Sequence, residues 1–214
     1  MNRRSFLAAA AGTAAVSTAG CTALFDASMP DELEGIDPDR QLPVPTLGDG
    51  TIPVDVYEDP GCDACQEFQA DVFPVLESAY IEPGVIEYRH YDFVVMAAAA
   101  SLEMANAARA VQAATRSDDD PNGAFFAYKS SVMADERESD DELAVAADAD
   151  AVDVAPDVVT DALEDETYYP TLAADWERGA EAGVEATPTV IVDGETVDTP
   201  LDPDAVGDAI ENAR

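Results

Sequence analysis

Apolar residues change from an alternating to a helical spacing and back again in the first half of the domain. Residues 51–59 alternate apolar and polar side chains, which predicts a strand. Residues 62–81 place apolar side chains at helical spacing, and Pro74 is expected to kink that helix. Residues 85–95 predict a second strand. The pattern therefore favours a strand–helix–strand unit of an α/β fold.

The middle of the chain is almost entirely helix-like. Within residues 97–116, Asn106 and Arg109 belong to a polar stripe that lies opposite an apolar one, as in an amphipathic helix. Asn122 is expected to cap the next helix, and Ser139 has the side chain of a helix N-cap. Several helices are therefore expected before the sheet resumes.

Two further strands and a helix are expected near the C-terminus. Thr187-Pro188-Thr189 directly precedes an apolar strand at residues 190–192, and Asp193-Gly194 is a hairpin signal before a strand at 195–199. Asp202-Pro203 fits the N-cap and first position of a last helix. A proline at the start of an inner strand is an unusual position, often with a cis peptide bond.

The charge of the chain is strongly negative. Its 214 residues include 46 acidic residues and 10 Lys or Arg, which gives a formal net charge of −36. The acids are spread along the chain, so the composition resembles that of salt-adapted proteins such as those of haloarchaea, where molar salt screens the repulsion. An acidic partner-binding surface is the alternative. Nucleic-acid binding is disfavoured because no basic patch exists to neutralise phosphates.

The N-terminus resembles an export signal. Arg3-Arg4 precedes a weakly apolar run, which resembles a twin-arginine signal peptide over residues 1–20. Small residues then lead to Cys21, as in a lipoprotein signal in which that cysteine receives lipid. We expect a lipid-anchored protein on the outer face of the cell membrane. The alternatives are an uncleaved anchor or an accidental cysteine behind an alanine-rich leader.

Residues 21–50 are expected to form a flexible acidic tether after the lipidated cysteine. This stretch is rich in Pro, Asp and Gly and has little periodicity. The alternative is a strand or strap that packs on the domain, for which residues 42–47 are suited.

The remaining cysteines form a Cys-x-x-Cys pair at the start of a predicted helix. Cys62 lies where free N–H groups and the helix dipole favour a thiolate, and Cys65 follows one turn later. A zinc site would need two further ligands, and His90 is expected to be structural. A structural disulfide would gain little from so short a loop. Thiol–disulfide chemistry is favoured, and Cu(I) binding remains an alternative.

These motifs together resemble the thioredoxin superfamily. Cys62-x-x-Cys65 on the first helix, the late segment "GVEATPTVIVDG" and the terminal strand and helix carry the resemblance, and the long helical middle is similar to the DsbA-like branch. The resemblance implies an α/β thioredoxin fold over residues 51–214. A helical domain, at about residues 97–183, would be inserted between the second strand and the cis-proline strand.

The resemblance also implies roles for single residues. Cys62 would be the exposed attacking thiol and Cys65 the resolving thiol, without a metal or an organic cofactor. Pro188 would be the cis-proline that faces them, and the backbone of Thr187 would bind the substrate strand. The family places a buried carboxylate at the position of Val56, so proton transfer from Cys65 is expected to pass through water.

Another departure from the family lies between the two cysteines. Strong oxidants of the family have a His there, and this chain has Asp63-Ala64. Asp63, with Glu58 and Asp59 nearby, is expected to disfavour the Cys62 thiolate through like charge and so to make the protein a weaker oxidant.

The expected function follows from these assignments. The protein would exchange disulfides with exported cysteine-containing proteins, as an oxidant that a membrane redox partner regenerates. The alternatives are a reductase or isomerase fed by a membrane electron donor, or a redox-idle module that binds peptides or Cu(I).

Overall fold

The computed structural model describes residues 27–134 and 139–214. The expected signal peptide at residues 1–20 and the expected lipidation site at Cys21 lie outside these ranges. Within them, the helices are all too short or too polar to cross a membrane.

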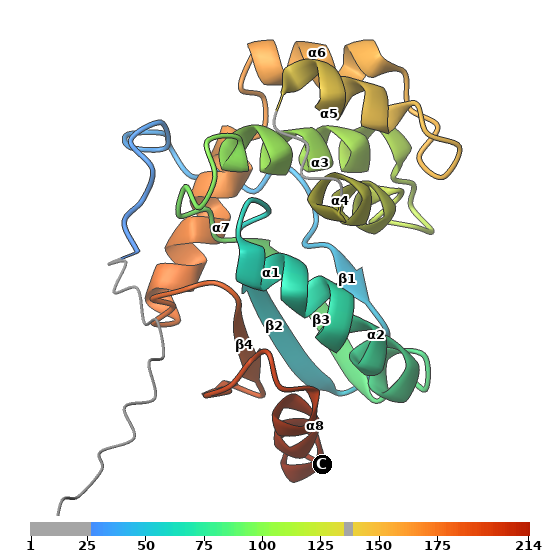
Figure 1. Cartoon of the computed structure of the whole chain (residues 1–214), viewed down its shortest axis with the longest axis vertical. Coiled ribbons are helices and arrows are strands. Elements are labelled where there is room, and N and C mark those ends of the chain that lie inside the picture. The colour runs from blue at the N-terminus through green and yellow to red at the C-terminus, as the bar shows by residue number, and fades with distance from the viewer. Residues whose placement is uncertain (1–26, 135–138) are drawn as a thin grey trace, which may run out of the picture.

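A five-stranded sheet forms the centre of the fold (Figure 1). The strands are β1 (Thr46–Leu47), β2 (Ile52–Glu58), β3 (Ile86–Asp92), β4 (Thr189–Val192) and β5 (Glu195–Thr196), in the spatial order β1-β3-β2-β4-β5. β2 and β3 are parallel, and the other neighbouring pairs are antiparallel. β2 is the middle strand, so its C-terminal end is enclosed by the rest of the fold.

The crossover between β2 and β3 is a helix broken into short segments. α1 (Asp63–Glu67) and α2 (Phe73–Leu76) alternate with π-helical turns at Phe68–Val72 and Glu77–Ile81. Pro74 lies in the first turn of α2, directly after a π-helical turn, and because it has no N–H it cannot continue the hydrogen bonding of the preceding helical segment. The expected kink at Pro74 stays a prediction. The same sheet face is covered by α8 (Pro203–Asn212), which Asp202 caps as expected.

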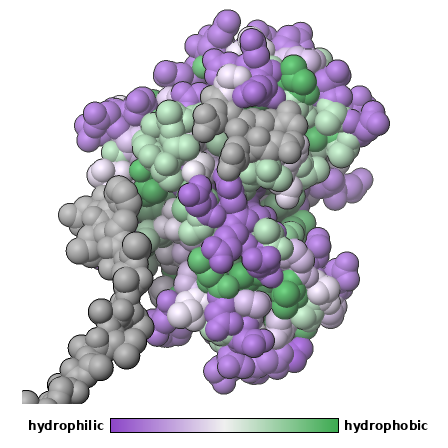
Figure 2. Space-filling view, in the orientation of Figure 1, coloured by the Kyte–Doolittle hydropathy of each residue, from purple (hydrophilic) through white to green (hydrophobic). Residues whose placement is uncertain are grey.

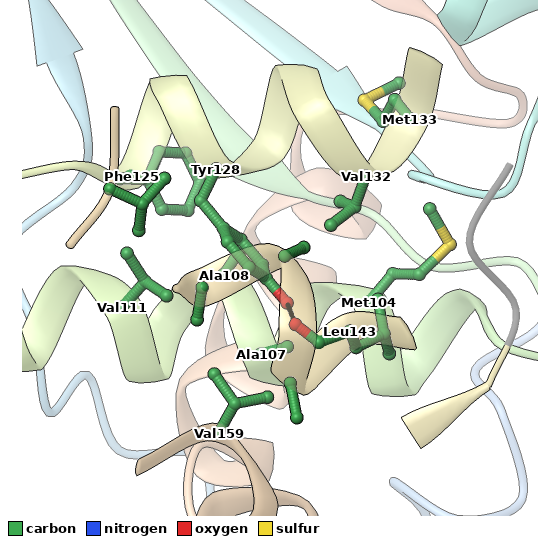
Figure 3. Close-up of a cluster of buried hydrophobic side chains, with 14 of the residues drawn as sticks. Met104, Ala107, Ala108, Val111, Phe125, Tyr128, Val132, Met133, Leu143 and Val159 are labelled. Carbon is green, nitrogen blue, oxygen red and sulfur yellow. Dashed lines mark hydrogen bonds between the residues drawn. The ribbon is translucent and has the colours of Figure 1, made fainter. Parts of the chain in front are cut away.

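The helices between β3 and β4 are α3 (Ser101–Thr115), α4 (Phe125–Ala134), α5 (Asp140–Ala147), α6 (Pro156–Glu164) and α7 (Tyr169–Glu181). The predicted thioredoxin fold with its helical insertion is therefore confirmed. α3 to α6 share an apolar core (Figure 3), in which the Tyr128 hydroxyl donates to the Leu143 carbonyl at 2.9 Å, and Cys65 of α1 packs into the same core. Ser139 forms the expected cap of α5 as part of a capping box.

The segment expected to be a tether is packed on the domain from residue 27 onward, so that expectation is wrong for residues 27–50. Leu33 and Leu42 are buried, and β1 pairs with β3. Asn122, expected to cap a helix, instead exchanges two hydrogen bonds with the backbone of Thr46, at 2.9 and 2.6 Å. We call residues 27–47 the strap. The strap packs on the domain because single apolar side chains contact α3 and α7 and its backbone forms hydrogen bonds with β3.

The polar stripe of α3 is buried, together with its apolar side. Arg109 is fully buried and donates through Nε to Asp92 and through Nη2 to Asp175, both at 2.7 Å. Asn106 donates to the Ala162 carbonyl at 2.7 Å. The stripe thus joins the helical insertion to the end of β3 and to α7 through paired charges and hydrogen bonds.

Hydrophilic residues cover most of the face of the molecule in Figure 2.

Candidate active site

Both cysteines lie at the start of α1, as predicted. Cys62 is the half-buried N-cap residue, and its carbonyl accepts from the N–H groups of Cys65 and Gln66, both at 3.0 Å. Cys65 is fully buried, and both thiols are free. The difference in exposure agrees with an attacking Cys62 and a resolving Cys65.

The predicted cis-proline faces this pair. The peptide bond between Thr187 and Pro188 is cis, and the Cys62 Sγ lies 3.5 Å from the Thr187 carbonyl oxygen. The loop before β4 and the start of α1 therefore meet at the same edge of the sheet. Hydrogen bonding of a substrate by the Thr187 backbone stays a prediction.

The surroundings of Cys62 favour its thiolate. A hydrogen bond from the Cys65 thiol is the leading cause that lowers the pKa of Cys62 to about 6, against the effect of burial. Hydrogen bonds from the Thr187 side chain and from the backbone N–H groups of Cys65 and Ala64 lower this pKa further. The expected disfavouring of this thiolate is therefore wrong. Asp63 is exposed and is not among the leading causes, because local donors dominate over a solvated charge.

The surroundings of Cys65, in contrast, disfavour its thiolate. Burial raises the pKa of Cys65 well above its ordinary value, and the hydrogen bond to Cys62 and the negative charge of Glu58 raise it further. Cys65 therefore stays a neutral thiol while Cys62 ionises. The pair combines a reactive outer sulfur with an inner sulfur that remains protonated.

A buried carboxylate lies beneath the pair, and the sequence reasoning missed it. Glu58 is fully buried at the end of β2, where its Oε2 accepts from Lys129 Nζ at 2.7 Å. The Nδ1 of His90 lies 3.2 Å from the same oxygen, and Gln69 Nε2 donates to both carboxylate oxygens at 2.9 and 3.0 Å. Burial alone would raise the pKa of Glu58, but Lys129 and His90 lower it to about 2. Glu58 is therefore ionised and held by three partners.

The alternation of β2 could have revealed this carboxylate. The family position Val56 is a buried apolar residue here, and Glu58 follows it on the same face of the strand. A polar residue at the next position of an otherwise apolar strand face is expected to be buried as well. His90 was expected to be structural, and this is confirmed: it is buried and bridges Glu58 and Asp92, whose Oδ1 lies 3.0 Å from His90 Nε2.

Asp59 holds the loop beside the active-site turn and is another residue that the sequence reasoning misjudged. Its Oδ1 accepts from the Gly61 N–H at 2.8 Å, and its Oδ2 accepts from the N–H groups of Val95 and Ala97 at 2.9 and 3.1 Å. Between those two residues, Met96 adopts a positive φ of 56°. Asp59 thus fixes the backbone on both sides of a strained residue and is fully buried itself.

The described part of the chain groups no three His, Cys, Asp or Glu side chains in a way that could hold a metal ion. Both ring nitrogens of His90 face carboxylates, so the ring is committed to Glu58 and Asp92.

A Cys-x-x-Cys pair at the first helix, opposite a cis-proline before an antiparallel strand, defines a thioredoxin fold. The chain belongs to the thioredoxin family, whose model, described as Thioredoxin, matches residues 46–212. Disulfide bond formation protein D of Bacillus subtilis (strain 168) is 22% identical over 174 residues, which are 78% of this chain and 75% of that protein.

Solved structures share the fold, including the helical insertion. Oxidised BdbD from Bacillus subtilis superposes with a TM-score of 0.69 and 22% identity, over 82% of this chain and 97% of that chain. DsbA from Chlamydia trachomatis gives a TM-score of 0.70 and 22% identity, over 80% of this chain and 91% of that chain. The predicted DsbA-like architecture is therefore confirmed.

Proposed function

We propose that this protein is a thiol–disulfide oxidoreductase that introduces disulfides into exported proteins. The observation that carries the proposal is the contrast within the pair: Cys62 has a pKa lowered to about 6, and Cys65 has a raised one. Only the outer sulfur is then accessible and stable as a thiolate, as disulfide exchange requires. The names of the similar proteins, disulfide bond formation protein D and DsbA, agree with this activity.

The oxidising cycle begins with a disulfide between Cys62 and Cys65. A substrate thiolate attacks the Cys62 sulfur, a mixed disulfide forms, and the sulfur of Cys65 leaves and takes up a proton. A second substrate thiolate then attacks the substrate sulfur of the mixed disulfide and releases Cys62 as a thiolate. Two electrons have passed to the cysteine pair, and the substrate has gained one disulfide. An electron acceptor in the membrane would reoxidise the pair.

The lowered pKa of Cys62 favours the oxidising direction. A stabilised thiolate stabilises the reduced protein, and a disulfide whose reduced form is stable is a stronger oxidant. The expectation of a weaker oxidant than the strongest of the family stays a prediction, because a pKa of about 6 stabilises the Cys62 thiolate less than a pKa near about 3.5 does in a strong oxidant.

Glu58 serves to keep Cys65 protonated. With a pKa lowered to about 2, Glu58 is a poor proton acceptor, and its negative charge instead disfavours the Cys65 thiolate. The proton that Cys65 gains or loses would therefore be exchanged with water. Lys129 and His90 stabilise the negative charge of the buried Glu58 carboxylate.

The proposed location rests on the sequence of the N-terminus. Arg3-Arg4 and Cys21 have the order and spacing of a twin-arginine lipoprotein signal, so we infer a lipid-anchored protein on the outer face of the cell membrane. The net charge of −36 further supports a protein that works in concentrated salt. Its partners would be exported cysteine-containing proteins and a membrane redox protein.

The reduction potential of the Cys62/Cys65 couple tests this function. The full chain with Cys21→Ser, which leaves only the pair, is equilibrated with graded thiol buffers in molar salt, and Cys62→Ser is the control. A potential of about −120 to −180 mV would support an oxidant or isomerase, and one near about −270 mV would mark a reductase. Without any two-electron titration the activity would be rejected, and Cu(I) retention that needs both thiols would then favour the binding module.

A further inference from the structure

One buried carboxylate joins the turn before the cysteine pair to the loop that follows β3. The turn is residues 59–62, and the loop is residues 95–98. Asp59 is fully buried; its Oδ1 accepts from the turn, at the Gly61 N–H, and its Oδ2 accepts from two N–H groups of the loop. β2 and β3 are parallel, so the turn and the loop leave the sheet at the same edge.

The loop depends on this carboxylate for its shape. Met96 lies between the two loop N–H groups that donate to Asp59, and its φ is 56°. This left-handed conformation is strained for a residue with a side chain, and it persists only where the surroundings impose it. Without the hydrogen bonds to Asp59, the loop would relax toward a less strained conformation.

The turn and the loop touch each other, so a movement of one displaces the other. A Cβ added at Gly61 would lie 2.6 Å from the Ala98 Cβ and 2.5 Å from the Ser101 Oγ. Both distances are shorter than van der Waals contact, and the missing side chain of Gly61 is what permits the close approach. The position of the turn is therefore coupled to the loop that Asp59 holds.

The backbone of Asp59 contacts the cysteine pair itself. Its carbonyl accepts from the Cys62 N–H at 3.1 Å. Burial is the leading cause that raises the pKa of Cys65, whereas a hydrogen bond from the backbone N–H of Asp59 lowers it. Asp59 thus binds the start of α1 through its carbonyl, the inner sulfur through its N–H and the loop through its side chain.

We propose that Asp59 is a positioning residue of the redox site, which fixes the turn so that local donors point at the Cys62 sulfur. These donors are the Cys65 thiol, the Thr187 side chain and the backbone N–H groups of Cys65 and Ala64. Hydrogen bonds weaken steeply when their angles change, so a small shift of the turn would weaken several of them at once. Asp59 would stabilise the Cys62 thiolate in this way although its own charge opposes that thiolate. The inference rests on the proposed function, because it concerns the thiolate that disulfide exchange uses.

The sign of the change in the pKa of Cys62 tests this role, because charge and position act in opposite directions. The assay is the pH dependence of Cys62 alkylation in the reduced full chain with Cys21→Ser. Asp59→Asn removes a negative charge, which alone would lower the midpoint, and replaces one acceptor oxygen by an NH₂ group that cannot accept. We expect the midpoint to rise by about one unit, because misaligned donors stabilise the thiolate less. Asp63→Asn, which removes an exposed charge next to Cys62, should not raise it.

Gly61→Ala tests the same coupling without a change of charge. Its Cβ would push the turn away from the loop, so the midpoint should rise in this variant as well. This variant decides the question if circular dichroism shows that Asp59→Asn is unfolded.

Two outcomes would overturn the proposal. A lower or unchanged midpoint in folded Asp59→Asn would mean that charge outweighs position or that Asp59 is not coupled to the thiolate. A midpoint in Gly61→Ala equal to that of the parent chain would mean that the turn does not align the donors. Neither outcome touches the proposed function, which the two-electron titration of the parent chain decides.

Discussion

Removal of the Cys65 thiol should raise the pKa of Cys62. The hydrogen bond from Cys65 is the leading cause of the lowered pKa of Cys62, which lies at about 6. A hydrogen bond to a charged group contributes about 1.5–3 kcal/mol, which corresponds to about one or two pKa units. Because Cys62 is only half-buried, solvent weakens the effect, and we expect a rise of about one unit in Cys65→Ala.

The assay is the pH dependence of Cys62 alkylation in the reduced full chain with Cys21→Ser. At pH 7 a thiol with a pKa of about 6 is about 90% thiolate, whereas a thiol with a pKa of about 8.5 is about 3% thiolate. Cys65→Ser keeps a hydroxyl donor at the same place and should show a smaller rise than Cys65→Ala. Cys62→Ser identifies the signal, because Cys65 is buried and its pKa is raised.

Two results would refute this reasoning. A wild-type midpoint near the ordinary value of about 8.5 would mean that the start of α1 and the Thr187 loop do not stabilise the thiolate. An unchanged midpoint in Cys65→Ala would mean that the Thr187 side chain and the backbone donors control the pKa of Cys62 without Cys65, and the contrast between the two sulfurs would then need another explanation.

The remaining predictions concern stability. Lys129→Met should lower the free energy of unfolding by about 3–5 kcal/mol in denaturant titrations, because Glu58 loses its buried partner, and Lys129→Met with Glu58→Gln should recover part of that loss. Glu58 has its pKa lowered to about 2 from 4.5, so its stabilisation is complete above pH 4.5 and is lost as the pH falls toward 2; acid unfolding of Glu58→Gln should lack this dependence. Gly179→Ala should lower the free energy of unfolding by about 1–3 kcal/mol, since its Cβ would lie 2.4 Å from the Phe93 ring, whereas the Cβ of Gly207→Ala would meet the Tyr80 side chain, whose hydroxyl is nearest at 3.0 Å, and should cost less. The thermal midpoint should rise steeply between 0.1 and 1 M salt, where the Debye length falls from about 10 to about 3 Å, and a flat profile would contradict adaptation to salt.

Local sequence patterns were enough to predict the reactive edge of the sheet. A Cys-x-x-Cys pair at a helix start and a Thr-Pro-Thr segment before a strand each carry their own signal, and the structure brings Cys62 to 3.5 Å from the Thr187 carbonyl. The helical insertion was predictable for the same reason, because helical spacing of apolar residues is visible within each segment.

The buried charges were not predictable in this way, because their partners are remote in the sequence. Glu58 and Lys129 are 71 positions apart, and Arg109 and Asp175 are 66 apart. A polar stripe on a helix looks the same whether it faces water or buried acids. The difference lies in tertiary contacts that periodicity does not record.

The strap was misjudged for a related physical reason. It has no periodic apolar face, so its sequence resembles a linker. Its order comes from single contacts, such as the pair of Arg40 with Asp175 and the hydrogen bonds of Thr46 with Asn122. A segment of this kind is stabilised by ion pairs and hydrogen bonds with residues elsewhere in the domain.

The burial of Lys129 has a consequence for chemical labelling. Lys129 is the only lysine of the sequence, and its ammonium group is enclosed beside Glu58. Amine-directed dyes and crosslinkers should therefore find no lysine to modify while the fold is closed. If α4 separates from α1, the helix that carries the two cysteines, the amine of Lys129 becomes reactive. The rate at which Lys129 is modified would then report, at a single atom, how often the helical insertion opens away from the two thiols.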